Sequence, residues 1–177
     1  MENIIEFLEQ INKLKKLKRK GWVIRCIPNP ESVADHSFRV SVMALMLAKK
    51  FNLDENKCIK LSIIHDLAES IVGDITPYDN ISNLDKEKLE LEAMKKLTNN
   101  LDNSDIYKIF KEYIEQKTLE AKFVYQIDKI EMLLQAYEYE LKHGKKVEYS
   151  AFLEYVSKRV TDPELIKLIK IIESKRK

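Results

Sequence analysis

The stretch LSIIHDLAESIVGD, residues 61–74, decides the fold, because it joins a helical apolar pattern to two adjacent polar residues. Apolar residues repeat at helical spacing through this stretch and the residues just before it; they are Ile59, Ile63, Ile64 and Leu67. This spacing predicts a helix over residues 55–71 that stops at Gly73. His65 and Asp66 follow directly on this buried-looking run. A carboxylate placed there is costly unless it is paired or holds a metal.

Outward from this stretch, the rest of the chain also predicts helices. Only three glycines and four prolines occur among 177 residues, which argues against an all-β fold and for an all-α single domain over 1–177. Residues 21–30, with Trp22 and Arg25, are predicted as an ordered loop because Pro28 and Pro30 force extended backbone. The other predicted helices cover residues 2–20, 32 to about 50 with Ser32 as cap, 83–98, 104–115, 118–142, 148–158 and 163–174.

Composition narrows the class of protein. The 31 basic and 29 acidic residues give a net charge of +2, which is not typical of a protein that coats nucleic acid. Cys26 and Cys58 match neither a zinc spacing nor a disulfide framework. The acidic N-terminus is unlike a signal peptide, and no run approaches the ~18 apolar residues of a membrane span. We therefore expect a cytoplasmic protein with no membrane partner.

Four polar residues in apolar helical contexts point to a metal centre. His36, His65, Asp66 and Asp128 come from three predicted helices and together offer imidazole and carboxylate ligands. This mixed nitrogen and oxygen set suits a divalent cation, with Mn²⁺, Co²⁺, Mg²⁺, Zn²⁺, Fe²⁺ and Ni²⁺ all open, and is poor for soft copper. Four protein ligands leave positions free on an octahedral ion, as a catalytic site requires.

Two further acids lie close in sequence. Glu69 follows His65 by four residues, so a continuous helix would place both on one face, where Glu69 could act as a general acid or base. Asp74 follows Gly73 in the predicted loop. The alternatives are a solvated helix residue for Glu69 and an ordinary turn aspartate for Asp74.

The order His36, His65-Asp66, Asp128 resembles the H…HD…D signature of HD-domain metal-dependent phosphohydrolases. Longer segments are similar to their 5′-deoxynucleotidase subfamily, which includes HD domain-containing protein 2 and the YfbR-type enzymes; these segments are GWVIR, PNPESVADHSFR, HDLAESIVGDITP and EAKFVYQIDKIEMLLQAYEYE. The similarity covers about residues 10–142, beyond which lie the predicted helices of 148–174.

The resemblance implies an HD-domain helical bundle, usually a homodimer, that hydrolyses deoxynucleoside 5′-monophosphates to deoxynucleoside and phosphate through a metal-activated water. It also implies that His36, His65, Asp66 and Asp128 bind the metal, with Glu69 as the acid or base. In the HD domain-containing protein 2 branch, a second metal site corresponds to Glu69, Asp74 and the backbone of Ile75. In the YfbR branch, Asp74 corresponds to a substrate contact.

The resemblance also implies that Trp22 lies near the substrate. The YfbR-type pattern has an arginine before this tryptophan, whereas this chain has Gly21, so Arg19, Lys20 and Arg25 are the nearest candidates for the phosphate contact.

Two of the predicted substrate residues have structural alternatives. Arg39, three residues after His36, is a further phosphate candidate, with a surface arginine as the alternative. Trp22 could stack on the base, with a core or interface aromatic as the alternative.

Rival functions are a cyclic-nucleotide phosphodiesterase or dNTP hydrolase, a helical dimer scaffold with a vestigial site, and a module that binds nucleic acid or a membrane surface. The last rests on KLKKLKRK, residues 13–20, beside Trp22, whose alternative is a solvated helix end. A small nucleotide is therefore the expected partner, and nucleic acid is the weaker expectation.

Overall fold

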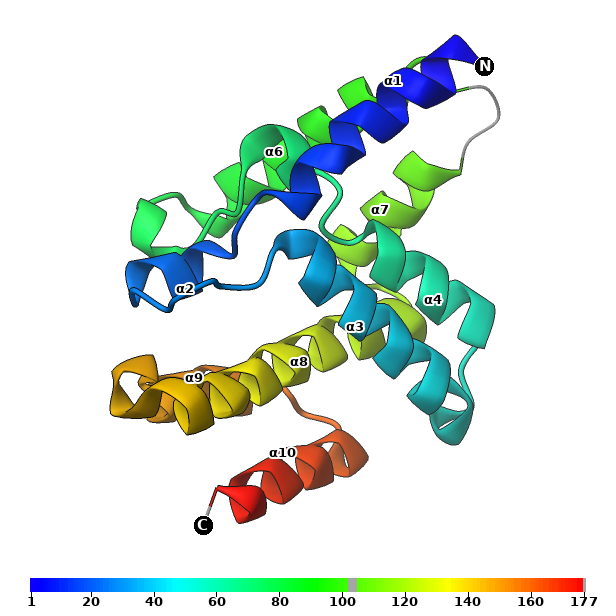
Figure 1. The fold of residues 1–177 in the computed structure, drawn as a ribbon. Coiled ribbons are helices and arrows are strands. Elements are labelled where there is room, and N and C mark those ends of the chain that lie inside the picture. Colours follow the sequence, from blue (N-terminus) through cyan, green and yellow to red (C-terminus); the bar gives the residue numbers. More distant parts are fainter. Residues whose placement is uncertain (102–104, 177) are drawn as a thin grey trace.

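The computed structural model of the chain describes residues 1–101 and 105–176, and within them the fold is all-α with no β-strand (Figure 1). The predicted fold class is thereby confirmed. The elements are α1 Glu2–Ile11, η1 Asn12–Lys15, α2 Lys20–Ile24, α3 Val33–Leu47, η2 Ala48–Phe51, α4 Glu55–Ile64, α5 Glu69–Val72, η3 Pro77–Asp79, α6 Asn83–Thr98, α7 Ile106–Glu115, α8 Leu119–His143, η4 Gly144–Val147, α9 Tyr149–Ser157 and α10 Pro163–Lys175.

Five of the ten α-helices in the described ranges begin at a residue whose side chain caps the helix. Ser32 accepts a hydrogen bond from the Asp35 backbone and forms a capping box with it, which confirms Ser32 as the cap of α3. Thr118 caps α8 in the same way through the Ala121 backbone. The predicted helix over 104–115 is α7, but residue 104 lies outside the described residues.

The prediction for the first thirty residues was wrong in two places. The helix expected over 2–20 ends at Ile11 as α1, and the chain then turns through η1. A short antiparallel bridge between Lys18 and Ser32 draws the chain beside the start of α3. The segment expected to be a loop then begins with the helix α2, which ends before Pro28 and so avoids the constraint that the proline imposes.

The helix expected over 55–71 is also interrupted. α4 ends at Ile64, and the chain resumes helical structure only at Glu69 as α5. Between them, the backbone N–H groups of Leu67, Glu69 and Ser70 each bond to a carbonyl three residues earlier rather than four. This tighter winding turns the chain, and Asp66 stands in the turn itself.

The long helix α8 supports the rest of the fold. It packs against α3, α4, α7, α9 and α10, and its predicted stripe of Phe123, Ile127 and Ile130 is buried, whereas Leu134 is only half-buried. In Figure 1, α1 lies beside α6 above α8, and α10 lies below it. A second apolar cluster, which includes Leu14, Ala68 and Phe110, joins the N-terminal segments to α6 and α7. No helix in the described ranges combines the length and apolar character that crossing a membrane requires.

Candidate metal centre and active site

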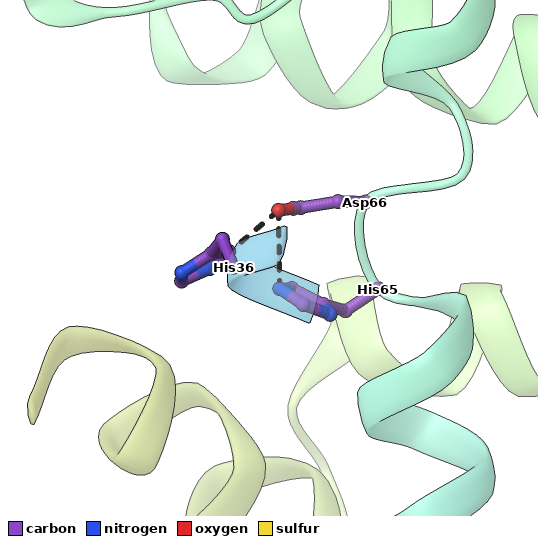
Figure 2. Close-up of side chains that lie close together, drawn as sticks. All are labelled: His36, His65 and Asp66. Carbon is purple, nitrogen blue, oxygen red and sulfur yellow. Dashed lines mark ion pairs between the residues drawn. The ribbon is translucent and has the colours of Figure 1, made fainter. Parts of the chain in front are cut away.

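The four predicted metal ligands come together from three directions. His36 comes from α3, His65 and Asp66 from the turn after α4, and Asp128 from α8. Asp66 Oδ2 lies 3.2 Å from His65 Nε2 and 3.7 Å from His36 Nε2, as Figure 2 shows. Asp128 Oδ1 lies 3.1 Å from His36 Nε2. Helices far apart in the sequence therefore meet with two imidazoles and two carboxylates facing one another.

The other ring nitrogen of each histidine is already engaged. His65 Nδ1 donates to the Ser62 carbonyl at 2.6 Å, and His36 Nδ1 donates to the Glu131 carboxylate. These bonds place a proton on Nδ1 in both rings, because the acceptors there are oxygens. Each Nε2 is thereby left to face Asp66, which is the arrangement that metal-ligating histidines require.

Several polar atoms at this point are buried without a hydrogen bond among the described residues. They are His36 Nε2, His65 Nε2, Asp66 Oδ2 and Glu69 Oε2. Buried polar atoms left in this state are costly, and so many in one place indicate a missing partner. Ligand atoms of His36, His65 and Asp66 lie within 4.8 Å of one another, which fits a single cation. The donor set therefore fits the divalent metal that the sequence predicts.

Asp128 is held differently from Asp66. Its Oδ2 accepts hydrogen bonds from Lys129 Nζ at 2.7 Å and from the Tyr113 hydroxyl at 3.3 Å. Its Oδ1 faces His36. Since one oxygen is committed to two donors, Asp128 is positioned to offer the other oxygen to a cation.

The electrostatics of the cluster favour positive charge at its centre. Burial and the charge of Arg19 lower the pKa of His36, but Glu131 and Asp128 outweigh them and raise it to about 10. Burial opposes ionisation of Asp66, but His65, Arg19 and His36 outweigh it and lower its pKa. The cluster thus stabilises a carboxylate and a cation side by side.

The pKa of Glu69 is shifted in the opposite direction to that of Asp66. It is only 4% exposed, and burial together with the charges of Asp66 and Asp74 raises its pKa well above the ordinary range of a glutamate. A carboxyl group whose pKa is raised in this way can hold a proton at a pH where an ordinary glutamate has lost it, which suits general acid–base chemistry.

A cavity of about 530 Å³ opens over the cluster. His65, Asp66, Glu69 and Asp128 line one part of it, and α6, α8 and α9 contribute other walls. Five cationic side chains also line the cavity: Arg19, Arg25, Lys86, Lys129 and Arg159. A concave site with acids at the metal cluster and cations around it suits a small anionic ligand.

The predicted substrate residues take different places. Trp22 lines the cavity but is 2% exposed; its indole N–H donates to Glu31 at 2.8 Å, and its ring packs on Tyr139 and Phe152. Arg25 lines the cavity too, with its guanidinium 4.5 Å from the Phe152 ring centroid and 3.3 Å from the Tyr78 hydroxyl.

Arg39 is not among the residues that line the cavity. Its guanidinium is bonded to Glu131, Gln135 and Glu138 on α8. The structure therefore brings Trp22 and Arg25 to the cavity and turns Arg39 toward the other side of the cluster.

Two of the three groups of the implied second metal site already have hydrogen-bond partners. Asp74 Oδ2 accepts a hydrogen bond from the Lys20 backbone N–H at 2.6 Å, and the Ile75 carbonyl accepts one from Lys86 Nζ at 3.2 Å. Glu69 alone of the three has a buried oxygen with no hydrogen bond. A second cation at this place would compete with the ammonium group of Lys86.

Sequence reasoning left one residue of the site undecided and missed three others. Arg19 was one of three basic candidates, and the structure places its guanidinium 3.5 Å from Asp66 Oδ2. Glu131 carried the same signal as Asp128, a carboxylate inside the apolar stripe of α8 one turn later. Lys86 and Tyr113 showed no local signal, because α6 and α7 reach the cavity only through tertiary packing.

Comparison with known proteins identifies the family to which the chain belongs. The model of the HD domain family matches residues 11–167, so the chain belongs to the HD domain family. Within that family it is similar to 5′-deoxynucleotidase HDDC2 of Bos taurus, at 41% identity over 98% of this chain and 86% of the relative. It is 40% identical to 5′-deoxynucleotidase hdd1 of Schizosaccharomyces pombe over 85% of this chain and 79% of the relative. A crystal structure of the PH0347 protein from Pyrococcus horikoshii superposes with a TM-score of 0.79 at 36% identity, covering 98% of this chain and 99% of that one.

Proposed function

We propose that this chain is a metal-dependent 5′-deoxynucleotidase, which hydrolyses deoxynucleoside 5′-monophosphates to deoxynucleoside and phosphate. The observation that carries the proposal is the group of buried ligand atoms of His36, His65 and Asp66 that make no hydrogen bond among the described residues, in a cluster that opens into a cavity whose lining includes five cationic side chains. The proposal is supported by relatives named 5′-deoxynucleotidase that align over nearly the whole chain.

The metal would be held by four side chains: His36 and His65 through Nε2, Asp66 through Oδ2 and Asp128 through Oδ1. A bound divalent cation supplies a water of lowered pKa and polarises the phosphoryl oxygens. Its identity is open among Mn²⁺, Co²⁺, Mg²⁺, Zn²⁺, Fe²⁺ and Ni²⁺, since the donor set suits several of them.

The protein's own groups would carry the remaining steps. Glu69 would hold or accept a proton at Oε2, the buried oxygen that has no hydrogen bond. The guanidinium of Arg19 lies beside Asp66 at the cavity wall and would neutralise phosphoryl charge. It would thereby take the role of the arginine that the YfbR-type pattern has where this chain has Gly21. Arg25 would contribute from the same wall.

The size of the cavity, together with the cationic side chains in its lining, favours a mononucleotide. About 530 Å³ falls within the ~300–1,000 Å³ typical of small-molecule sites. Two cations of the basic stretch 13–20 are directed to partners near the cavity: Arg19 to Asp66 and Lys20 to Asp79. This use of the stretch supports a small anionic substrate over a nucleic acid. The homodimer and the cytoplasmic location stay predictions.

The test is phosphate release from a panel of deoxynucleoside and ribonucleoside monophosphates, with cAMP and dATP included. We expect metal-dependent release from dAMP, with Mn²⁺, Co²⁺, Mg²⁺ and Zn²⁺ compared after chelation. His65→Ala and Asp66→Ala should each abolish activity and metal binding. His143→Ala is the matched control, because His143 lies at the end of α8 and does not line the cavity.

The outcome that contradicts the proposal is full turnover by the metal-free His65→Ala/Asp66→Ala double variant. Preferred hydrolysis of cAMP or dATP would keep the metal centre and change the substrate class.

A further inference from the structure

The carboxylate of Glu131, one helical turn after the proposed ligand Asp128, accepts a hydrogen bond from His36. Glu131 has no exposed surface, and its Oε2 accepts the Nδ1–H of His36, whose ring is likewise fully buried. The opposite edge of that ring presents Nε2 to Asp66 and Asp128. The direction in which His36 faces the metal site is therefore set by its bond to Glu131.

The second oxygen of Glu131 is committed as well. Arg39 Nε donates to Oε1 at 2.7 Å, while the two terminal nitrogens of Arg39 donate to Glu138 and Gln135, also at 2.7 Å. These three acceptors stand on one face of α8, at positions i, i+4 and i+7. Arg39 is thereby clamped by α8 and in turn holds Glu131.

This network is different from a second metal site. Glu31, His36 and Glu131 do bring ligand atoms within 4.8 Å of one another. However, both oxygens of Glu131 already accept hydrogen bonds, and Glu31 accepts the indole N–H of Trp22. Both oxygens of Glu131 and the Nδ1 of His36 are therefore used in bonds that orient side chains, which leaves a cation few ligand atoms in this cluster.

A contribution to stability alone does not account for the bonds among His36, Glu131 and Arg39 either. Buried ion pairs contribute little net stability, and apolar residues of similar volume often replace them without loss. Here Glu131 and the ligand Asp128 are three residues apart on α8, while Arg39 and the ligand His36 are three residues apart on α3. Each helix thus supplies one ligand and one group that supports the cluster from behind.

We propose that Glu131, clamped by Arg39, is the positioning residue of the metal centre: it fixes His36 with its proton on Nδ1, so that Nε2 is free and aimed at the cation. The proposal rests on the metal site of the proposed function and not on its substrate. Carboxylates placed behind metal-bound histidines typically change metal affinity 10- to 100-fold when they are removed.

The experiment is a Mn²⁺ titration of the full chain without nucleotide, in which free Mn²⁺ is followed by electron paramagnetic resonance. Glu131→Gln preserves the side-chain shape but cannot offer an oxygen to both His36 and Arg39. We expect its Mn²⁺ dissociation constant to rise about 10- to 100-fold. Glu164→Gln is the matched control, because Glu164 is an exposed glutamate on α10 that belongs neither to this network nor to the cavity lining; its affinity should stay within about twofold.

Circular dichroism establishes that each variant is folded at the temperature of the titration, and the visible spectrum of the Co²⁺ form reports the ligand set. A folded Glu131→Gln with wild-type Mn²⁺ affinity and an unchanged Co²⁺ spectrum overturns the proposal. If Glu131→Gln does not fold, Arg39→Lys decides, since lysine cannot hold three acceptors in a planar fork. Wild-type Mn²⁺ affinity in Arg39→Lys then overturns it.

The failure of the proposed function is a separate result. A chain that releases no phosphate from dAMP, but whose Mn²⁺ affinity falls in Glu131→Gln, refutes the substrate and supports the positioning role.

Discussion

Replacing Glu69 with glutamine tests the chemistry of the site most directly. Glu69 begins α5, is 4% exposed, and has a buried Oε2 without a hydrogen bond among the described residues. Burial and the charges of Asp66 and Asp74 raise its pKa. Glutamine keeps the size of the side chain but can neither ionise nor transfer a proton as a carboxyl group does, so Glu69→Gln separates proton transfer from packing.

The kinetic effect follows from the role assigned to Glu69. A positioned acid or base contributes about 10²- to 10⁴-fold to a rate. At about 1.4 kcal/mol per tenfold change, this is about 3–5 kcal/mol of transition-state stabilisation. We expect kcat for dAMP to fall by that factor while the Mn²⁺ bound by the His36, His65, Asp66 and Asp128 set is retained.

The same substitution has a pH-dependent effect on the metal-free protein. The unfolded glutamate ionises above about pH 4.3, whereas folded Glu69 keeps its proton to higher pH. Above pH 4.3, this difference lowers the free energy of unfolding of the wild type by up to about 1.4 kcal/mol per pH unit, until the folded pKa is passed. Glutamine does not ionise, so Glu69→Gln should become more stable than the wild type as the pH rises.

The assays are phosphate release from dAMP and urea unfolding in the presence of a chelator at pH 5, 6, 7 and 8. Glu92→Gln is the matched control, because Glu92 is an exposed glutamate on α6 that does not line the active-site cavity; neither quantity should change. A kcat within threefold of the wild type would remove Glu69 from the chemistry. A stability difference that does not grow with pH would refute the raised pKa.

Two further predictions concern the metal and the loop after α5. Mn²⁺ at 100 times its dissociation constant should raise the free energy of unfolding by about 2.7 kcal/mol, and so Tm by about 5–10 °C in a chain of 177 residues; equal Tm values in Mn²⁺ and in chelator contradict this. Gly73→Ala should cost about 1–3 kcal/mol in urea unfolding, because φ is +80° and a Cβ there meets nothing within 4 Å, so the cost is backbone strain alone. A loss below about 0.5 kcal/mol would show that the strain is relieved elsewhere.

Much of the fold was predictable because helices are encoded locally. Apolar spacing gave α8 to within one residue at each end and α6 with the bounds observed, and the cap at Ser32 set the start of α3. The errors fall where a distant contact overrides the local pattern. The bridge between Lys18 and Ser32 is such a contact, and it redirects the chain before α2.

The residues of the candidate site also divide into those that the sequence predicted and those that depend on tertiary contacts. The four proposed metal ligands were found from sequence because a histidine or an aspartate within an apolar helical pattern calls for a partner. The interruption after Ile64 was not found, since residues 55–71 keep helical periodicity throughout. Its effect is to place Asp66 in a turn and not on the helix face that periodicity predicts.

The sequence by itself determined the helical class, most helix bounds, and which residue types face one another at the candidate metal centre. Only the tertiary structure decided how those residues are held. Glu131 is 95 residues from the His36 that it orients, and Asp74 is 54 residues from the Lys20 backbone that it accepts from. Periodicity and capping act over a few residues, whereas these hydrogen bonds exist only because packing on α8 and α2 brings the segments together.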